Sequence, residues 1–241
     1  LGMLIDNVLM HQYLVKNTAP PPAPEIDKKL VEMEAALKAQ KKTLAEVCHE
    51  MHMTPAKMRD DVSDHLRWAA YVRDHVSDAQ VEQYHKEYKD FFDRVLVRCS
   101  HIVMRVPPTA PEAEKAQARA KLQEVHAQLL ANKLDFAEAA KKYSQCITAD
   151  KGGDLGYIPR KWGPTDELFA KTAFSMQVGQ VSDVIQTEYG LHLIKVTERK
   201  PGQPEEFAKI KEKVREMYAE EMSVQLVGEQ HKTAKVEVRL P

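Results

Sequence analysis

Two histidines lie inside apolar stretches, and their type and placement make them the residues best suited to chemistry. His101 lies within residues 97–105, and His192 lies within residues 189–196; both stretches have the composition of strands. Cys146 and a Gly-Gly-Asp-Leu-Gly turn at residues 152–156 come between them. An imidazole can donate or accept a proton near neutral pH and can also bind a metal. A lone histidine in a strand is usually structural, but two in this arrangement indicate a site.

The sequence leaves a thiol or metal enzyme open as an alternative. Cys146 would need a nearby base to act as a nucleophile, and no protease-type signature surrounds it. Together with His101 and His192 it would offer three zinc ligands, but no fourth ligand at a typical spacing follows. Cys48 and His52 lie four residues apart on one helical face, without the His-Glu-x-x-His order of metalloproteases. A buried cysteine is the simpler interpretation of that helix.

The order of a histidine strand, a cysteine, a Gly-Gly-Asp-Leu-Gly turn and a Gly-x-His strand resembles the parvulin family of peptidyl-prolyl cis-trans isomerases. The resemblance covers roughly residues 96–199. It implies that His101 and His192 lie side by side on neighbouring central strands, as a hydrogen-bonded pair beneath the substrate amide. It also implies that Cys146 lies near the substrate carbonyl and that Thr187 bonds one of the histidines. These four residues are the candidate catalytic set.

The same resemblance implies an apolar cup for the proline ring. Leu155 in the glycine turn and Phe169 in the following helix match the cup. Many parvulins have a methionine four residues before the phenylalanine, where this sequence has Thr165. We therefore expect a shallower cup, or one that Trp162 partly fills. Residues 106–112, after the first strand, lack the paired arginines of phosphate-directed relatives, so selectivity for phosphoserine-proline is not expected.

Hydrophobic periodicity predicts the elements that position these residues. Residues 1–92 form an all-helical segment, in which Thr54 and Pro55 begin one helix as N-cap and first residue. Residues 93–200 follow the order β-α-α-α-β-β, which predicts a small antiparallel sheet with helices on it. Residues 201–241 contain a long amphipathic helix at 205–227 and a short strand at 235–240, and return to the helical segment. The fold class is therefore α+β, with a parvulin domain inserted in an all-α, chaperone-like domain.

Composition excludes several classes of function. The 241 residues carry a net charge of −1 although 29% are charged, so no basic excess indicates a nucleic-acid partner. The sequence contains no run of 18 apolar residues, so it predicts no integral membrane segment. The first residues lack the features of a signal peptide and have the pattern of a helix interior. Three cysteines are an odd number and form no disulfide framework.

The layout, a parvulin domain flanked by helices, resembles the SurA and PrsA group of bacterial foldases. That resemblance implies an isomerase and chaperone that acts on unfolded, nascent or exported proline-containing polypeptides. It further implies an extracytoplasmic location, in the periplasm or cell envelope, and no cofactor. The alternative is a chaperone or dimerisation module that only binds and whose parvulin domain is inactive. Because a short helix precedes a proline-rich stretch at residues 19–24, a helix-swapped homodimer is a further hypothesis.

Overall fold

The computed structural model describes residues 2–237 and divides into two units. A helical unit joins the chain up to Tyr84 with the chain from Ile210 onward, and a sheet unit comprises His85–Lys209. The sheet unit is thus inserted in the sequence of the helical unit. The sequence expectation placed the two divisions at 92/93 and 200/201 instead.

The segments on either side of the sheet remain with it because they contact each other. The His85 ring packs against Phe92, with ring centroids 5.3 Å apart, and against Phe207 at 5.1 Å. The carbonyl of Asp93 accepts a hydrogen bond from the Gln203 N–H at 2.7 Å. These contacts explain why the sheet unit extends beyond its strands at both ends.

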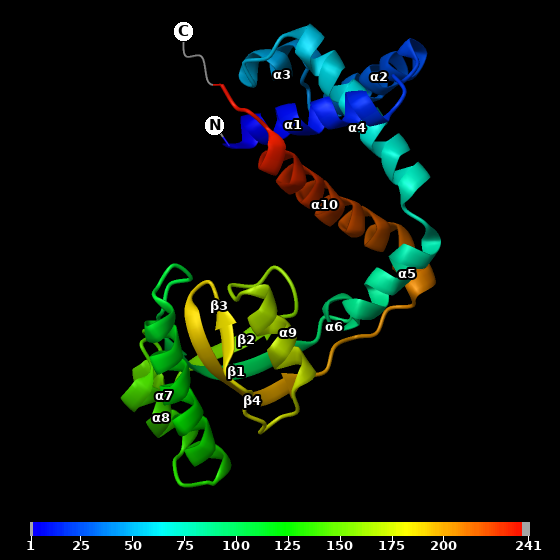
Figure 1. Ribbon diagram of the computed structural model, residues 1–241. Helices are drawn as coiled ribbons and strands as arrows, with labels where there is room; N and C mark the ends of the chain where they lie inside the picture. Colours follow the sequence, from blue (N-terminus) through cyan, green and yellow to red (C-terminus); the bar gives the residue numbers. More distant parts are fainter. Residues whose placement is uncertain (1, 238–241) are drawn as a thin grey trace. The chain divides into compact units, whose positions relative to one another are not determined.

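Short-range signals place the helices of the helical unit close to where the sequence predicts them. Thr43 and Glu46 form a reciprocal capping box, and Thr54 caps a helix that begins at Pro55. The final helix contacts the turn at residues 76–78, where Arg215 donates to the Val76 carbonyl at 2.9 Å. The helices are α1 (Gly2–Asn17), α2 (Ala23–Ala39), α3 (Leu44–Glu50), α4 (Pro55–His75), α5 (Asp78–Glu87) and α10 (Phe207–Thr233), labelled in Figure 1. The expected strand at 235–240 begins in residues without regular structure and otherwise lies outside the described residues.

The sheet unit contains four antiparallel strands in the order β2-β1-β4-β3. The strand β1 is central and pairs with both β2 and β4. Figure 1 shows α7 and α8 on one side of the sheet and α9 on the other. The elements are α6 (Lys89–Phe92), β1 (Leu96–Met104), α7 (Glu112–Leu130), α8 (Phe136–Tyr143), a 3-10 turn (Ala149–Lys151), β2 (Asp154–Pro159), α9 (Glu167–Ser175), β3 (Ile185–Thr187) and β4 (Gly190–Lys200).

The antiparallel sheet is confirmed, but it has one strand more than the expected order β-α-α-α-β-β. Residues 154–159, the first three of which belong to the expected glycine turn, form the edge strand β2. In β2 only Ile158 is fully buried, so the alternating apolar pattern of a strand is weak there. Arg98 of β1 supports the pairing through an ion pair with Asp154 at 2.7 Å. This long-range contact explains a strand that local periodicity does not indicate.

Side-chain alternation in β1 and β4 sends alternate residues to two apolar clusters, one on each face of the sheet. Ile102 and Leu193 belong to the cluster that includes α7 and α8. Cys99 and Ile194 belong to the cluster that includes α9. Because His101 and His192 follow the same alternation as Cys99 and Ile194, both histidines point toward the α9 face.

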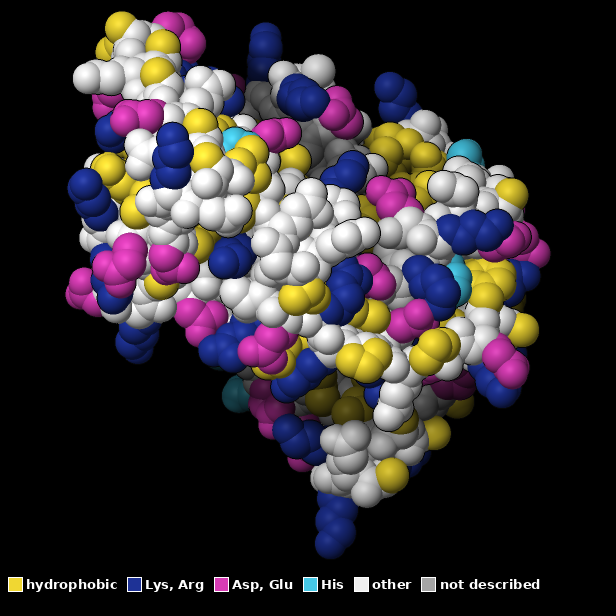
Figure 2. Space-filling view, turned by 90° about the horizontal axis from the view of Figure 1, so that it is seen from below, with side chains coloured by type: hydrophobic (Ala, Val, Ile, Leu, Met, Phe, Trp, Pro, Cys, Tyr) yellow, Lys and Arg dark blue, Asp and Glu magenta, His cyan; other side chains and the backbone are white. Residues whose placement is uncertain are grey.

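The described surface is mixed in charge. On the face drawn in Figure 2, acidic and basic side chains are interspersed over the whole area, in keeping with the net charge of −1. Within residues 2–237, no helix is both long enough and apolar enough to cross a bilayer.

Candidate active site

Strand pairing brings the two predicted histidines together. In the β1–β4 ladder, Val103 lies opposite His192 and His101 lies opposite Ile194, so the histidines are diagonal neighbours on one face. Their Nδ1 atoms are 3.4 Å apart. Their ring centroids are 5.6 Å apart, and their planes are 26° from parallel. Both side chains are buried.

A chain of hydrogen bonds orients this pair. The Thr187 Oγ1 atom lies 2.8 Å from His192 Nε2 and accepts a hydrogen bond from the Tyr189 N–H at 3.1 Å. With its oxygen already accepting, Thr187 is suited to donate its hydroxyl hydrogen to His192 Nε2. In that arrangement His192 donates from Nδ1 to His101 Nδ1. The proton of His101 is then on Nε2, which is buried and has no hydrogen-bond partner within the described residues 2–237.

Both imidazoles are neutral at physiological pH. Burial lowers the pKa of His101 to about 4. Burial also lowers the pKa of His192 to about 4, with a further lowering from His101 and an opposing effect of the Asp166 carboxylate. A buried site disfavours a charged imidazolium because it removes the ion from water. The pair can therefore present hydrogen-bonding groups without bringing net charge into the cavity.

Phe169 covers the pair. Its ring centroid lies 5.8 Å from that of His101 and 5.7 Å from that of His192, at nearly perpendicular angles of 77° and 82°. The Asp166 carboxylate caps α9 by accepting from the Leu168 and Phe169 N–H groups at 2.8 and 3.3 Å. This cap fixes the start of the helix that carries Phe169.

These residues line a cavity of about 410 Å³. It contains seven of the eight predicted site residues, namely His101, Cys146, Leu155, Thr165, Phe169, Thr187 and His192. The structure places the eighth elsewhere. Trp162 has a left-handed backbone (φ 57°), is 65% exposed and meets Phe91 edge to face at 5.1 Å. The contact with Phe91 holds the indole away from the cavity, so the alternative in which Trp162 partly fills the cup is wrong.

Hydrogen bonds to β1 hold the segment that carries Cys146 beside the cavity. The Gln145 N–H donates to the Val103 carbonyl at 2.8 Å, and the Gln145 side-chain oxygen accepts from the Arg105 N–H at 2.6 Å. The thiol of Cys146 is half-buried, whereas that of Cys99 is fully buried. Burial raises the pKa of Cys99 to about 12. Cys99 is therefore a core residue rather than a reactive thiol.

Sequence reasoning missed some of the residues that line the cavity. Val103 and Arg105 follow His101 at two-residue intervals, so strand alternation alone was the signal for them. Asp166 lies at the cavity because it caps α9. Tyr189 lies there because it belongs to the turn between β3 and β4. The additional lining residues are Val103, Arg105, Pro164, Asp166 and Tyr189.

A close backbone approach explains the glycine turn beside the site. Gly153 has φ 77°, and its carbonyl accepts from the His101 N–H at 2.9 Å. A Cβ atom at Gly153 would lie only 2.1 Å from the His101 carbonyl oxygen. Only glycine therefore lets this turn contact the histidine strand.

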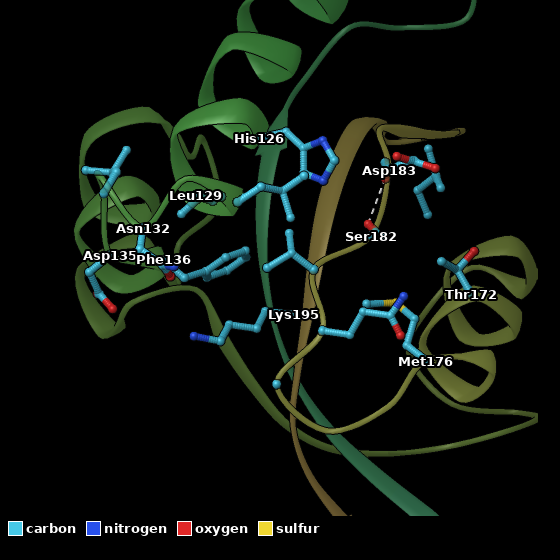
Figure 3. A pocket seen from close by; sticks show the side chains of 16 residues that line it. His126, Leu129, Asn132, Asp135, Phe136, Thr172, Met176, Ser182, Asp183 and Lys195 are labelled. Carbon is cyan, nitrogen blue, oxygen red and sulfur yellow. Dashed lines mark hydrogen bonds between the residues drawn. The ribbon is translucent and has the colours of Figure 1, made fainter.

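A larger hollow of about 850 Å³ lies elsewhere in the sheet unit, beside α7, α8 and α9 (Figure 3). Its labelled side chains include His126, Asp135 and Lys195, and none of the residues of the histidine cavity line it. The Asp135 carboxylate is used to cap α8, and the Ser182 hydroxyl donates to the Asp183 carbonyl at 2.7 Å. Within residues 2–237, no group of three or more His, Cys, Asp or Glu residues is placed to hold a metal ion.

Comparison with known proteins assigns the class of the sheet unit. Residues 101–198 match the family described as "Rotamase: PPIC-type PPIASE domain", so this part of the chain belongs to the parvulin-type peptidyl-prolyl isomerase domains. The match begins at His101 and includes the rest of the histidine cavity.

More particularly, the chain is similar to proteins named Foldase protein PrsA. It is 36% identical over 125 residues to that of Bacillus subtilis, covering 52% of this chain and 36% of the relative. It is 35% identical over 160 residues to that of Geobacillus sp. strain WCH70, covering 65% and 50%. The chain thus spans between a third and a half of the length of these relatives. The crystal structure of the peptidylprolyl isomerase PrsA from Bacillus anthracis has the same fold (TM-score 0.54, 21% identity, 98% of this chain and 99% of the other).

Proposed function

We propose that the sheet unit catalyses cis-trans isomerisation of peptide bonds that precede proline in polypeptide substrates. The observation that carries this proposal is the neutral histidine pair beneath Phe169, in an apolar cavity of a PPIC-type domain. A peptide bond to proline exists in both isomers, and their interconversion is slow enough to limit folding. A protein that accelerates it would act on chains that have not yet folded.

The reaction requires rotation and no covalent change. Resonance gives the peptide C–N bond a barrier of about 18–20 kcal/mol. A catalyst must bind the twisted amide more tightly than the planar one. The planar form is the more charge-separated of the two, so an apolar cavity with little water disfavours it. Hydrogen-bond donors fixed in place stabilise the twisted carbonyl or the pyramidal nitrogen.

We assign roles to the cavity residues on this basis. Phe169 and Leu155 hold the proline ring. His101 faces the amide with its unpartnered Nε2 atom, and His192 and Thr187 hold that imidazole in one orientation. Cys146 lies near the substrate carbonyl as a polar neighbour and not as a nucleophile. Thr165 contributes a second buried polar atom, Oγ1, which like His101 Nε2 has no hydrogen-bond partner within residues 2–237.

A protease-free assay with a proline-containing tetrapeptide tests the proposal. We expect the wild type to accelerate isomerisation well above the spontaneous rate, Phe169→Ala to lose at least tenfold in kcat/KM, and Cys146→Ala to lose less. Circular dichroism must show that each variant is folded. A folded wild type with no rate above background would refute the enzyme proposal. A folded Phe169→Ala variant with full activity would refute the assignment of the cup.

A second proposed activity is chaperone-like binding of unfolded chains. It is favoured by the helical unit, which surrounds the isomerase sequence, and by the relatives named as foldases. Suppression of client aggregation without isomerisation would instead support the alternative of a module that only binds. Loss of isomerisation on addition of a chelator would support the metal alternative. The proposal includes no cofactor.

The partners and location follow from the same resemblance. We propose that the clients are unfolded or nascent proline-containing polypeptides and that the protein works outside the cytoplasm. The helix-swapped homodimer remains a hypothesis. Light scattering at micromolar concentration tests it, since a mass near the 27.4 kDa of one chain would reject it.

A further inference from the structure

A second candidate binding site lies wholly within the helical unit. A groove of about 830 Å³ runs between α4 and α10. Residues of both helices and of the turn after α4 line it, and none of them belongs to the isomerase cavity. The walls differ in character, because the α4 side is mainly apolar and the α10 side is mainly acidic. The apolar wall includes Trp68, Val72 and Val76, and the acidic wall includes Glu212, Glu216 and Glu220.

The apolar wall is held rigid by stacked rings. Trp68 is half-buried and stacks on Tyr71, with centroids 5.7 Å apart and planes 13° from parallel. Tyr71 in turn stacks on His75 at 4.0 Å and meets Tyr13 of α1 edge to face at 5.6 Å. The Tyr13 and Tyr71 hydroxyls are also hydrogen-bonded at 2.7 Å. The indole is thus a preformed surface for an apolar or cationic side chain.

Two carboxylates of the acidic wall are free to pair with a ligand, and a third, that of Glu212, pairs with Arg215 at 3.6 Å. Glu212, Glu216 and Glu220 are spaced four residues apart and therefore share one face of α10. Glu216 and Glu220 are exposed and form no ion pair or side-chain hydrogen bond within residues 2–237. The Arg215 guanidinium also borders the groove, but it is bound to Asp78 at 2.5 Å.

The other arginine at the groove is also paired. Arg73 donates from Nε to Asp74 at 2.8 Å. With both arginines engaged, the groove offers unpaired negative charge on one wall and apolar surface on the other. An extended chain sends alternate side chains to opposite sides. A segment with alternating cationic and apolar residues therefore matches both walls at once.

We propose that this groove binds cationic-apolar segments of unfolded polypeptide, in which Lys or Arg alternates with Leu or aromatic residues. The apolar side chains pack on Trp68 and Val72, and the cationic side chains pair with Glu216 and Glu220. This inference deepens the chaperone part of the proposed function and rests on it. In this proposal the groove selects clients by charge, whereas the histidine cavity selects for proline.

Binding of a labelled peptide tests the proposal with the whole chain. The probe is a fluorescein-labelled twelve-residue peptide of alternating Lys and Leu, followed by fluorescence anisotropy at low salt. We expect Glu216→Gln/Glu220→Gln to weaken binding about five- to tenfold, and 0.5 M salt to remove most of that difference because the Debye length shortens to a few ångströms. The control Glu32→Gln/Glu229→Gln removes two exposed carboxylates of the same unit outside the groove, each paired to a neighbouring lysine. It should bind like the wild type.

The two tryptophans locate the binding site. Only Trp68 lines the groove, while Trp162 lies in the sheet unit. In ¹⁵N-labelled protein, the Trp68 indole N–H signal should shift on addition of the peptide and the Trp162 signal should not. Equal loss in both double variants, an unmoved Trp68 signal, or equal affinity for a peptide with Glu in place of Lys would overturn the proposal.

Two further outcomes separate this inference from the functions on which it rests. If the wild type suppresses aggregation of an unfolded client but does not bind the cationic peptide, the groove proposal fails and the chaperone function stands. If light scattering shows a dimer that Glu216→Gln/Glu220→Gln dissociates, and the peptide does not compete, the groove is an interface between copies of the chain. That result would also overturn the proposal.

Discussion

At the scale of single residues, the decisive property of the site is that two imidazoles are buried as a neutral pair. Each histidine alone would be an ordinary strand residue that needs a polar partner. Here His192 has Thr187 and His101 as partners, while His101 retains one unpartnered nitrogen. An unsatisfied buried polar group carries a cost in stability. That cost is accounted for if a substrate amide supplies the missing partner.

The depressed pKa values give an expectation for pH dependence. Both folded-state pKa values are lowered to about 4, below the 6.5 of a free imidazole. The unfolded chain therefore binds more protons between pH 6.5 and 4. The stability due to the neutral pair is fully present above pH 6.5 and is lost as pH falls toward 4.

Imidazole NMR signals provide the measurement. Those of His101 and His192 should stay in the neutral form down to about pH 5. Isomerase activity should stay level from pH 8 to about 5.5 and decline at lower pH. A midpoint near 6.5 for both signals would contradict the burial argument.

At the scale of elements, strand register decides which residues form the site. The pairing of β1 with β4 places His192 opposite Val103, two residues from His101. A slip of one residue would turn one histidine to the opposite face of the sheet. Arg98 helps to hold the register, because it bonds Asp154 of β2 at 2.7 Å and Glu198 of β4 at 2.8 Å.

The glycine turn offers a matched test of this arrangement. Gly153→Ala would place a Cβ atom 2.1 Å from the His101 carbonyl oxygen, whereas Gly156→Ala meets nothing within 4 Å. Both glycines have positive φ, 77° and 72°, so both variants carry the backbone strain of about 1–2 kcal/mol. The excess destabilisation of Gly153→Ala is then due to the lost contact with β1.

We expect Gly153→Ala to lower the free energy of unfolding by roughly 2 kcal/mol more than Gly156→Ala does, as for other steric disruptions in a core. Urea unfolding followed through NMR signals of β1 measures the difference. Equal destabilisation by the two substitutions would show that the close approach to His101 is not a constraint on the fold.

At the scale of the whole molecule, the chain has two candidate binding sites in separate units. The histidine cavity lies within His85–Lys209, and the groove between α4 and α10 lies in the helical unit. Their chemistries differ, since one is a small cavity suited to a proline ring and the other a long groove with unpaired carboxylates. A client would satisfy them with different parts of its sequence.

Substitutions should therefore separate the two activities. We expect Phe169→Ala to lose tetrapeptide isomerisation and to bind the Lys-Leu peptide with wild-type affinity. Glu216→Gln/Glu220→Gln should show the reverse, with unchanged kcat/KM. The measurement is tetrapeptide isomerisation and Lys-Leu peptide binding, each carried out on both variants. Loss of both activities in either folded variant would indicate that the two sites are coupled.

Several features of this protein follow from the sequence by itself, because their causes are local. Thr43 and Thr54 mark helix starts through caps that act over three residues. The two histidine strands were identifiable from their residue types and order, and the resemblance to parvulins pointed to Phe169. Side-chain alternation then determined which face of β1 and β4 would carry the histidines.

Other features were decided only by the tertiary structure, because they depend on residues distant in the sequence. The edge strand β2 depends on pairing with β1, some 56 residues away at the Arg98–Asp154 contact. The Trp162 side chain lies outside the cavity because it packs against Phe91. The acidic groove exists because α4 and α10, separated in sequence by the whole sheet unit, form its two walls. Periodicity describes one element at a time, whereas each of these features requires two elements to meet.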